Sequence, residues 1–121
     1  MTVMTSNSII GEKSMVYAIR IVNLYKYLVL QKNEHVLSKQ LLRSGTSIGA
    51  NTRESKNAQS RKDFLTKLSI ALKEADETEY WLELLYKTGY LDENQYQSIQ
   101  NDTSELIKIL TSIIKKLKSD T

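Results

Sequence analysis

A polar stripe at helical spacing is the first feature of this sequence that suggests chemistry. Arg43, Ser47, Asn51 and Glu54 follow one another at i, i+4, i+8 and i+11, so on a helix they share one face about 80° wide. Arg43 and Glu54 would lie about 16 Å apart along the axis, too far to pair with each other. Each charge therefore needs a partner on another helix, on a neighbouring subunit or on a ligand. Two interpretations stay open: a buried polar ladder that fixes helix register, and a stripe that faces a ligand.

Basic side chains accompany this stripe and form the best candidate for phosphate contacts. Residues 32–73 carry nine basic and three acidic side chains, net +6, whereas residues 74–105 carry one basic and nine acidic, net −8. A chain with such segregated charge can present a basic face to nucleic acid. The alternative is that the basic stretch faces the acidic one, within the chain or between subunits. The predicted nucleic-acid contacts are Lys39, Arg43, Arg53, Lys56, Arg61 and Lys62.

Catalytic and metal chemistry find little support in the sequence. There is no cysteine and only one histidine, His35, so thiolate sites and sites with two imidazoles are excluded. The run from Ser44 to Gly49 lacks the Gly-Lys-Ser/Thr ending of a phosphate-binding loop. No aromatic residues are interleaved with the basic ones, so base stacking is not predicted. We therefore expect no enzymatic activity, no cofactor and no metal.

The elements that position these residues are predicted to be helices of a single domain. The 121 residues include no proline and only four glycines, with 40% hydrophobic and 26% charged residues, typical of an α-rich protein. Short connections between long helices favour antiparallel neighbours. The sequence thus predicts an all-α, antiparallel up-down-up-down four-helix bundle over residues 13–121, after a flexible segment over 1–12. The expected helices span about 13–31, 36–57, 60–88 and 92–118.

The second of these helices is unusual because its middle is rich in Ser, Thr and Gly, which are mediocre or poor helix formers. Apolar periodicity nevertheless favours a helix, and Gly45 and Gly49 belong to a seam of small side chains that would let another backbone come close. Ser60 and Asp92 are predicted N-caps of the third and fourth helices. Gly89 is predicted to end the third helix in the left-handed conformation.

The third helix carries two apolar stripes and so needs two surfaces to pack against. One is the core of the bundle, and the other is predicted to be a second subunit. The predicted oligomer interface consists of Ile70, Glu74, Glu77, Trp81, Leu84 and Leu85.

The N-terminal residues resemble no secretory signal, and no apolar run approaches the roughly 20 residues of a spanning helix. We therefore expect a cytoplasmic protein with no membrane partner.

Several motifs together resemble a known family. The chain reads LLRSGTSIGANTRES over residues 41–55, then SRKDFLTKLSIALKEADETEYWLELL over 60–85 and TGYL over 88–91. This is similar to the four-helix-bundle proteins of intervening sequences in bacterial large-subunit (23S) ribosomal RNA genes. The resemblance covers about residues 13–117. It is carried by Arg43, Ser47, Ile48, Asn51 and Glu54, by Ser60, Asp63 and Phe64, and by Ala71, Glu77, Gly89 and Tyr90.

The resemblance implies a ring-like homopentamer without enzymatic activity. It also implies kinship with the accessory protein of diversity-generating retroelements, which binds nucleic acid and a reverse transcriptase. One departure is visible, since many members have Ala-Glu-Gly after the asparagine where this chain has Thr52-Arg53-Glu54-Ser55. The change removes the glycine and adds the positive charge of Arg53.

Two functional hypotheses follow. The first is a non-catalytic, oligomeric protein that binds nucleic acid, RNA more than DNA, or assembles a ribonucleoprotein, through the basic face of the second helix. The second is a protein-interaction scaffold with no nucleic-acid ligand.

Overall fold

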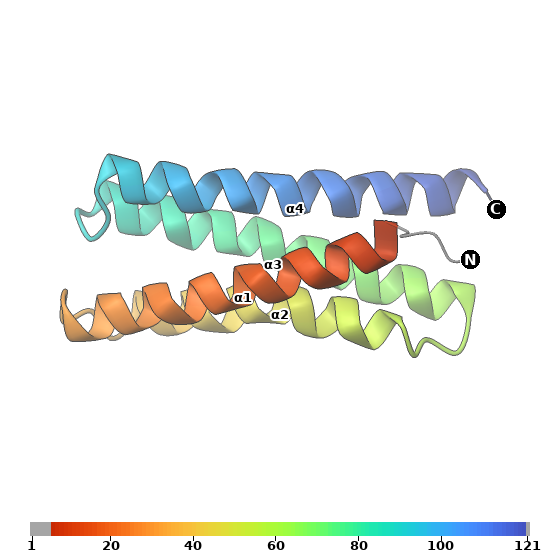
Figure 1. Cartoon of the computed structure of the whole chain (residues 1–121), viewed down its shortest axis with the longest axis horizontal. Coiled ribbons are helices and arrows are strands. Elements are labelled where there is room, and N and C mark those ends of the chain that lie inside the picture. The colour runs from red at the N-terminus through yellow and green to blue at the C-terminus, as the bar shows by residue number, and fades with distance from the viewer. Residues whose placement is uncertain (1–5, 121) are drawn as a thin grey trace.

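The computed structural model describes residues 6–120, which form four helices and, within that range, no strand. The helices are α1 (Ser6–Leu30), α2 (Leu37–Ser55), α3 (Arg61–Lys87) and α4 (Glu93–Ser119). They lie side by side along one long axis, and their connections fall at alternating ends (Figure 1). α1 packs against α2 and α4, and α3 packs against the same two helices. The prediction of an all-α protein with four helices is confirmed. No helix in the described range is long and apolar enough to cross a membrane.

The first helix begins earlier than the sequence pattern predicted. α1 starts at Ser6 rather than near residue 13, so residues 6–12 are helical and not a flexible segment. The physical reason is that Ile10 and Ser14 continue the four-three spacing of Tyr17 and Ile21 toward the N-terminus. Ile10 is fully buried, and Ser14 is nearly so. Residues 1–5, the rest of the predicted flexible segment, lie outside the described residues.

The ends of α3 and α4 follow their sequence signals. The Ser60 side chain accepts a hydrogen bond from the Asp63 backbone N–H at 3.0 Å. Asp92 and Gln95 form a reciprocal capping box at the start of α4. Gly89 follows α3 with φ of +87°, the conformation that favours glycine. These three predictions of helix ends are confirmed.

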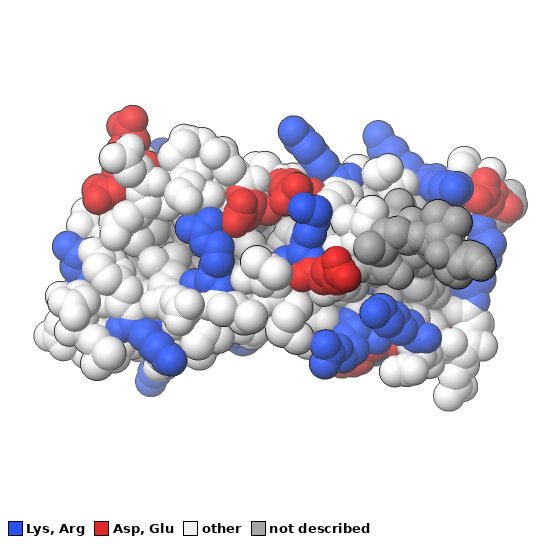
Figure 2. Space-filling view, viewed as in Figure 1, with Lys and Arg blue, Asp and Glu red and all other residues white. Residues whose placement is uncertain are grey.

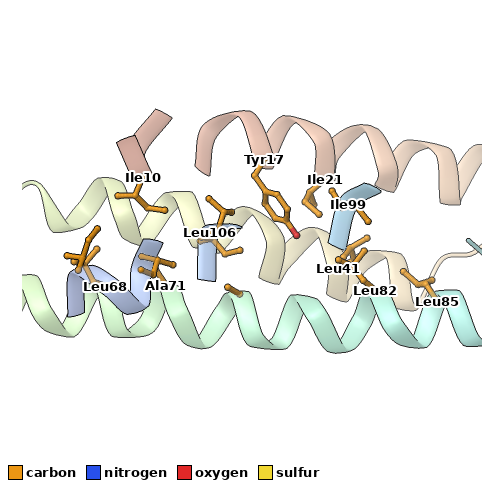
Figure 3. Packing of buried hydrophobic residues seen from close by; sticks show 14 of the residues in the cluster. Ile10, Tyr17, Ile21, Leu41, Leu68, Ala71, Leu82, Leu85, Ile99 and Leu106 are labelled. Carbon is orange, nitrogen blue, oxygen red and sulfur yellow. The ribbon is translucent and has the colours of Figure 1, made fainter. Parts of the chain in front are cut away.

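The core runs along the axis between the four helices (Figure 3). It contains two hydroxyl pairs among the apolar side chains. Tyr17 of α1 and Thr103 of α4 share a buried hydrogen bond of 2.6 Å. Burial raises the pKa of the Tyr17 hydroxyl well above its usual range, so the group remains neutral. Ser44 of α2 and Thr78 of α3 share a second buried bond of 2.9 Å. Each bond satisfies polar groups that would be costly to bury alone.

The small residues of α2 allow α1 to approach closely, as the sequence predicted. A Cβ atom at Gly45 would lie 2.8 Å from two side-chain carbons of Ile21. A Cβ at Gly49 would lie 3.3 Å from the backbone oxygen of Ser14. The glycines therefore serve helix packing, which explains why a mediocre helix-forming sequence is helical here.

The residue that starts α2 was not predicted from the sequence. Glu34, only 7% exposed, accepts hydrogen bonds from the backbone N–H groups of Val36, Leu37 and Ser38 at 3.1, 2.8 and 2.6 Å. Burial by itself would raise the pKa of this carboxyl group. The three N–H donors outweigh burial, and the pKa lies below its ordinary value. The Glu34 carboxylate thus satisfies N–H groups that the start of a helix leaves unpaired.

Replacing Gly45 by alanine should destabilise the protein. The new methyl group would overlap the fully buried Ile21, whose branched side chain has little rotamer freedom. We expect the free energy of unfolding to fall by about 1–3 kcal/mol, although alanine is the better helix former. Urea denaturation measures this value. Gly49→Ala is the matched control and should stay within about 1 kcal/mol of wild type. Equal stability of the two variants would contradict close packing at Gly45.

Replacing Glu34 by glutamine should destabilise the protein at neutral pH and not in acid. The folded pKa of Glu34 lies below its unfolded value of about 4.3, so the stabilisation is complete above that value and is lost as pH falls through the folded pKa. We expect a loss of about 1–2 kcal/mol at pH 7. Denaturation at neutral and acid pH tests this, with Glu83→Gln on the exposed face of α3 as the control. A loss that does not depend on pH would argue against an ionised cap.

Candidate nucleic-acid interface

The polar stripe of α2 connects this helix to α3. The Arg43 guanidinium forms ion pairs with Glu77 and, at 3.4 Å, with Glu74. The Glu54 carboxylate lies 2.9 Å from Lys67 Nζ. Both charged ends of the stripe therefore find partners on another helix, one of the three possibilities that the spacing left open. The side chains of Arg43 and Glu54 are 49% and 57% exposed, so the stripe is not a buried ladder.

The middle of the stripe bonds within its own helix. The Ser47 hydroxyl donates to the Arg43 carbonyl at 2.6 Å, and the Asn51 amide donates to the Ser47 carbonyl at 2.9 Å. Both side chains are half-buried. Both donors find their acceptors within α2 and need no ligand. The stripe therefore connects α2 to α3 through its two charged ends.

Glu77 also organises the aromatic residues of α3. The Trp81 indole N–H donates to Glu77 Oε2 at 2.9 Å, so the same carboxylate serves Arg43 and Trp81. The ring of Tyr80, 57% exposed, meets the Trp81 ring edge to face at 5.0 Å. Arg43, Glu77 and Trp81 thus form one connected polar group on the surface.

The predicted oligomer interface is only partly at the surface. Ile70 is 37% exposed, and Glu74, Glu77, Trp81 and Leu84 are partly exposed. Leu85 is fully buried in the core of the single chain, so its assignment to an oligomer interface was wrong. Leu85 lies within about 60° of Leu82 and Thr78 around the helix axis, which places it on the core side of α3.

The six predicted nucleic-acid contacts do not form one surface. Arg43 is matched by two carboxylates, and Arg61 donates to the Leu117 carbonyl at 3.2 Å and lies 3.9 Å from Asp120. Lys39 lies fourteen residues before Arg53, about 21 Å along α2. Three exposed cations remain near the α2–α3 connection, Arg53, Lys56 and Lys62, on two different sides of the bundle.

These three cations have no ion pair with any residue in the range 6–120. Arg53 and Lys56 line a hollow of about 440 Å³ between α1 and α2, together with apolar residues and with Glu54, whose carboxylate pairs with Lys67. Lys62 lies on the outer side of α3. Their positive charge is therefore available to an anionic ligand.

The fold separates charge along its long axis. Residues 6–18, 47–74 and 106–120 lie toward the end where α4 finishes, and they carry eleven basic and five acidic side chains, net +6. Residues 19–46 and 75–105 lie toward the other end, with six basic and nine acidic side chains, net −3. Figure 2 shows Lys and Arg side chains gathered toward the first end, on α4 and along the opposite edge of the visible face. We call the first half the basic end.

α4 contributes to this end, although none of its residues is among the predicted nucleic-acid contacts. Its C-terminal half carries the four lysines Lys108, Lys115, Lys116 and Lys118. This half of α4 lies toward the same end of the bundle as the α2–α3 connection (Figure 1). Combining the predicted helix order with the charge of each half-helix would have identified the basic end.

Within residues 6–120, no three His, Cys, Asp or Glu side chains gather in a way that could hold a metal ion.

Comparison with known proteins agrees with this architecture of four packed helices. Residues 6–112 match the model of the 23S rRNA-intervening sequence protein family. The chain is 60% identical to a protein of unknown function from the S23 ribosomal protein family of Bacteroides thetaiotaomicron, whose crystal structure was solved at 1.70 Å. That match covers 92% of this chain and 99% of the other, with a TM-score of 0.91. No curated protein matched the chain.

The chain therefore belongs to the family of 23S rRNA-intervening sequence proteins, as the motifs indicated. Several residues that carried the resemblance stabilise the fold of the single chain. Arg43 pairs with Glu77, Ser60 caps α3 through Asp63, and Gly89 ends that helix. This part of the motif set joins α2 to α3 and determines where α3 begins and ends.

The pairing of Arg43 with Glu77 should contribute measurably to stability. In a double-mutant cycle of Arg43→Gln and Glu77→Gln, we expect a coupling energy of about 0.5–1 kcal/mol, because both side chains are partly exposed. The coupling should weaken in high salt, which screens exposed charges. Urea denaturation followed by circular dichroism gives the four stabilities. A coupling of zero would mean that Arg43 does not hold α2 to α3 and is available to a ligand.

Proposed function

We propose that this protein is a non-catalytic, oligomeric nucleic-acid-binding protein, with RNA favoured over DNA, and that the ligand contacts the basic end. The observation that carries the proposal is a set of three exposed cations, Arg53, Lys56 and Lys62, that form no ion pair within residues 6–120 and lie on the half of the fold with net charge +6. An up-down-up-down order of the helices supports this, because it gathers the end of α2, the start of α3 and the end of α4. Phosphate contacts of this kind supply most of the affinity in non-specific nucleic-acid binding.

RNA is favoured because the family is defined by intervening sequences of 23S rRNA. Assembly into a homo-oligomer, a pentamer by the family resemblance, would multiply the basic end and raise the overall affinity. Exposed apolar side chains support assembly: Met15, Val16 and Ile19 of α1 are 44%, 61% and 55% exposed. A reverse transcriptase or another protein partner is a further proposal that rests on the resemblance alone.

A protein-interaction scaffold is the second candidate function. It is favoured by the ion pairs between α2 and α3, in which Arg43 and Lys67 meet carboxylates of the same chain. Some of the basic side chains are thus compensated by acidic side chains of the same chain. A scaffold would use the exposed apolar residues of α1 and would not need the basic end.

Reversing the charge of Arg53 and Lys56 should weaken binding to RNA. We expect Arg53→Glu/Lys56→Glu to lower affinity for a structured RNA about tenfold or more at 0.1 M salt, and to reduce the slope of log affinity against log salt by about 1–2. Fluorescence anisotropy at several salt concentrations measures both values, and light scattering checks the oligomeric mass.

The matched control is Lys26→Glu/Lys32→Glu, two exposed lysines of the other half with the same change in net charge. This control should change affinity less than about threefold. If a well-formed oligomer of the wild type binds no RNA or duplex DNA at low salt, the proposed function is wrong and the scaffold takes its place.

A further inference from the structure

The outer side of α3 carries a groove that the sequence analysis did not identify. It has a volume of about 480 Å³ and is lined by Lys62, Thr66, Ser69 and Lys73 of α3, with Lys118 of α4 across from them. Leu65 and Ile70 form its apolar part. Among the described residues that line it, none is acidic.

The spacing of the cations limits what this groove could bind. Lys62 and Lys73 are eleven residues apart, about 16 Å along the helix. Thr66 and Ser69 stand between them at i+4 and i+7, so basic and hydroxyl side chains follow one face of α3. Phosphates spaced along a chain match this separation better than a single phosphate group does. A ligand that uses the whole groove must carry several negative charges along its length.

The apolar part of the groove limits the ligand further. Ile70 is 37% exposed, and Leu65 is half-buried, so covering them with an apolar surface is favourable. A nucleic-acid duplex presents phosphates and sugars on its outside and keeps the faces of its bases stacked within. An unpaired strand exposes both its phosphates and its base faces.

We propose that this groove binds a single strand of nucleic acid, with the phosphates along Lys62 and Lys73 and a base or ribose against Leu65 and Ile70. The inference rests on the proposed function and deepens it, since it selects unpaired strands and adds Lys73 to the contacts. The groove lies in the basic end, where the surrounding net charge of +6 attracts a polyanion.

The first experiment compares affinities for a fluorescent single-stranded oligouridylate of about 12 nucleotides and for a duplex of the same length. We expect the wild type to prefer the single strand. The Lys62→Glu/Lys73→Glu variant should lose about tenfold or more in affinity for the single strand and much less for the duplex. Lys26→Glu/Lys32→Glu is again the matched control. Circular dichroism and light scattering confirm that each variant keeps its fold and mass.

A second experiment locates the strand directly, since the chain contains no cysteine. Ser69→Cys places a single thiol in the groove, and Asn23→Cys places one on the exposed side of α1. With a photocrosslinker on each thiol, the oligouridylate should crosslink to the Ser69→Cys protein and not to the Asn23→Cys protein.

The outcomes separate this inference from the proposed function. If the wild type binds no nucleic acid at low salt, the proposed function fails. If the wild type binds but the groove variant keeps its affinity, or both thiols crosslink equally, the groove is overturned while the proposed function stands. A preference for the duplex would also overturn the single-strand assignment.

Discussion

The close approach of α1 to α2 at Gly45 is the constraint on which the rest of this fold depends. There is no room for even a methyl group between the α2 backbone and the Ile21 side chain, so the helix that carries the polar stripe of the family motif is held by packing and not by its own propensity. Because the opposite side of α2 then meets α3, the position of α2 determines where Arg43 and Glu54 find their carboxylate and ammonium partners. The polar connection between α2 and α3 is thus a consequence of apolar packing between α1 and α2.

Most of the fold could be predicted from the sequence because its signals are local. These signals each act over a few residues and agree with one another. They are the capping residues of α3 and α4, the left-handed Gly89, and the heptad spacing of Ile99, Thr103 and Leu106. The start of α1 and the cap of α2 were missed. In the first case the periodic pattern continues through Ser14 to Ile10, but the residues around these positions are mostly polar, so the signal is weak. In the second, the Glu34 carboxylate replaced the Ser, Thr, Asp or Asn that normally signals a helix start.

The candidate site was less predictable because it depends on which helix ends meet. The sequence places six cations near α2. Two of them, Arg43 and Arg61, bind partners within the chain, and Lys39 lies at the opposite end of α2 from the other three. The lysines of α4 join the remaining three only through the direction in which the helices run (Figure 1). A sequence shows which positions are charged. Whether a charge has an oppositely charged partner depends on which residues lie next to it in the folded chain. The motif that identified the family accordingly explains packing better than it explains ligand binding.

The two buried hydroxyl pairs have a mechanical consequence for the surface. The bond between Tyr17 and Thr103 joins α1 to α4, and the bond between Ser44 and Thr78 joins α2 to α3. Sliding the first pair would leave the buried Tyr17 hydroxyl unbonded, and sliding the second would leave that of Ser44 unbonded, at about 1–3 kcal/mol for each group. The two threonine hydroxyls would keep their bonds to carbonyls of their own helices. Since the Gly45 contact fixes α1 against α2, the axial offset between α3 and α4 is fixed through the other three junctions. The spacing of the backbone positions that carry the cations is therefore constant, and a ligand can be met only by movement of the long side chains or of its own backbone.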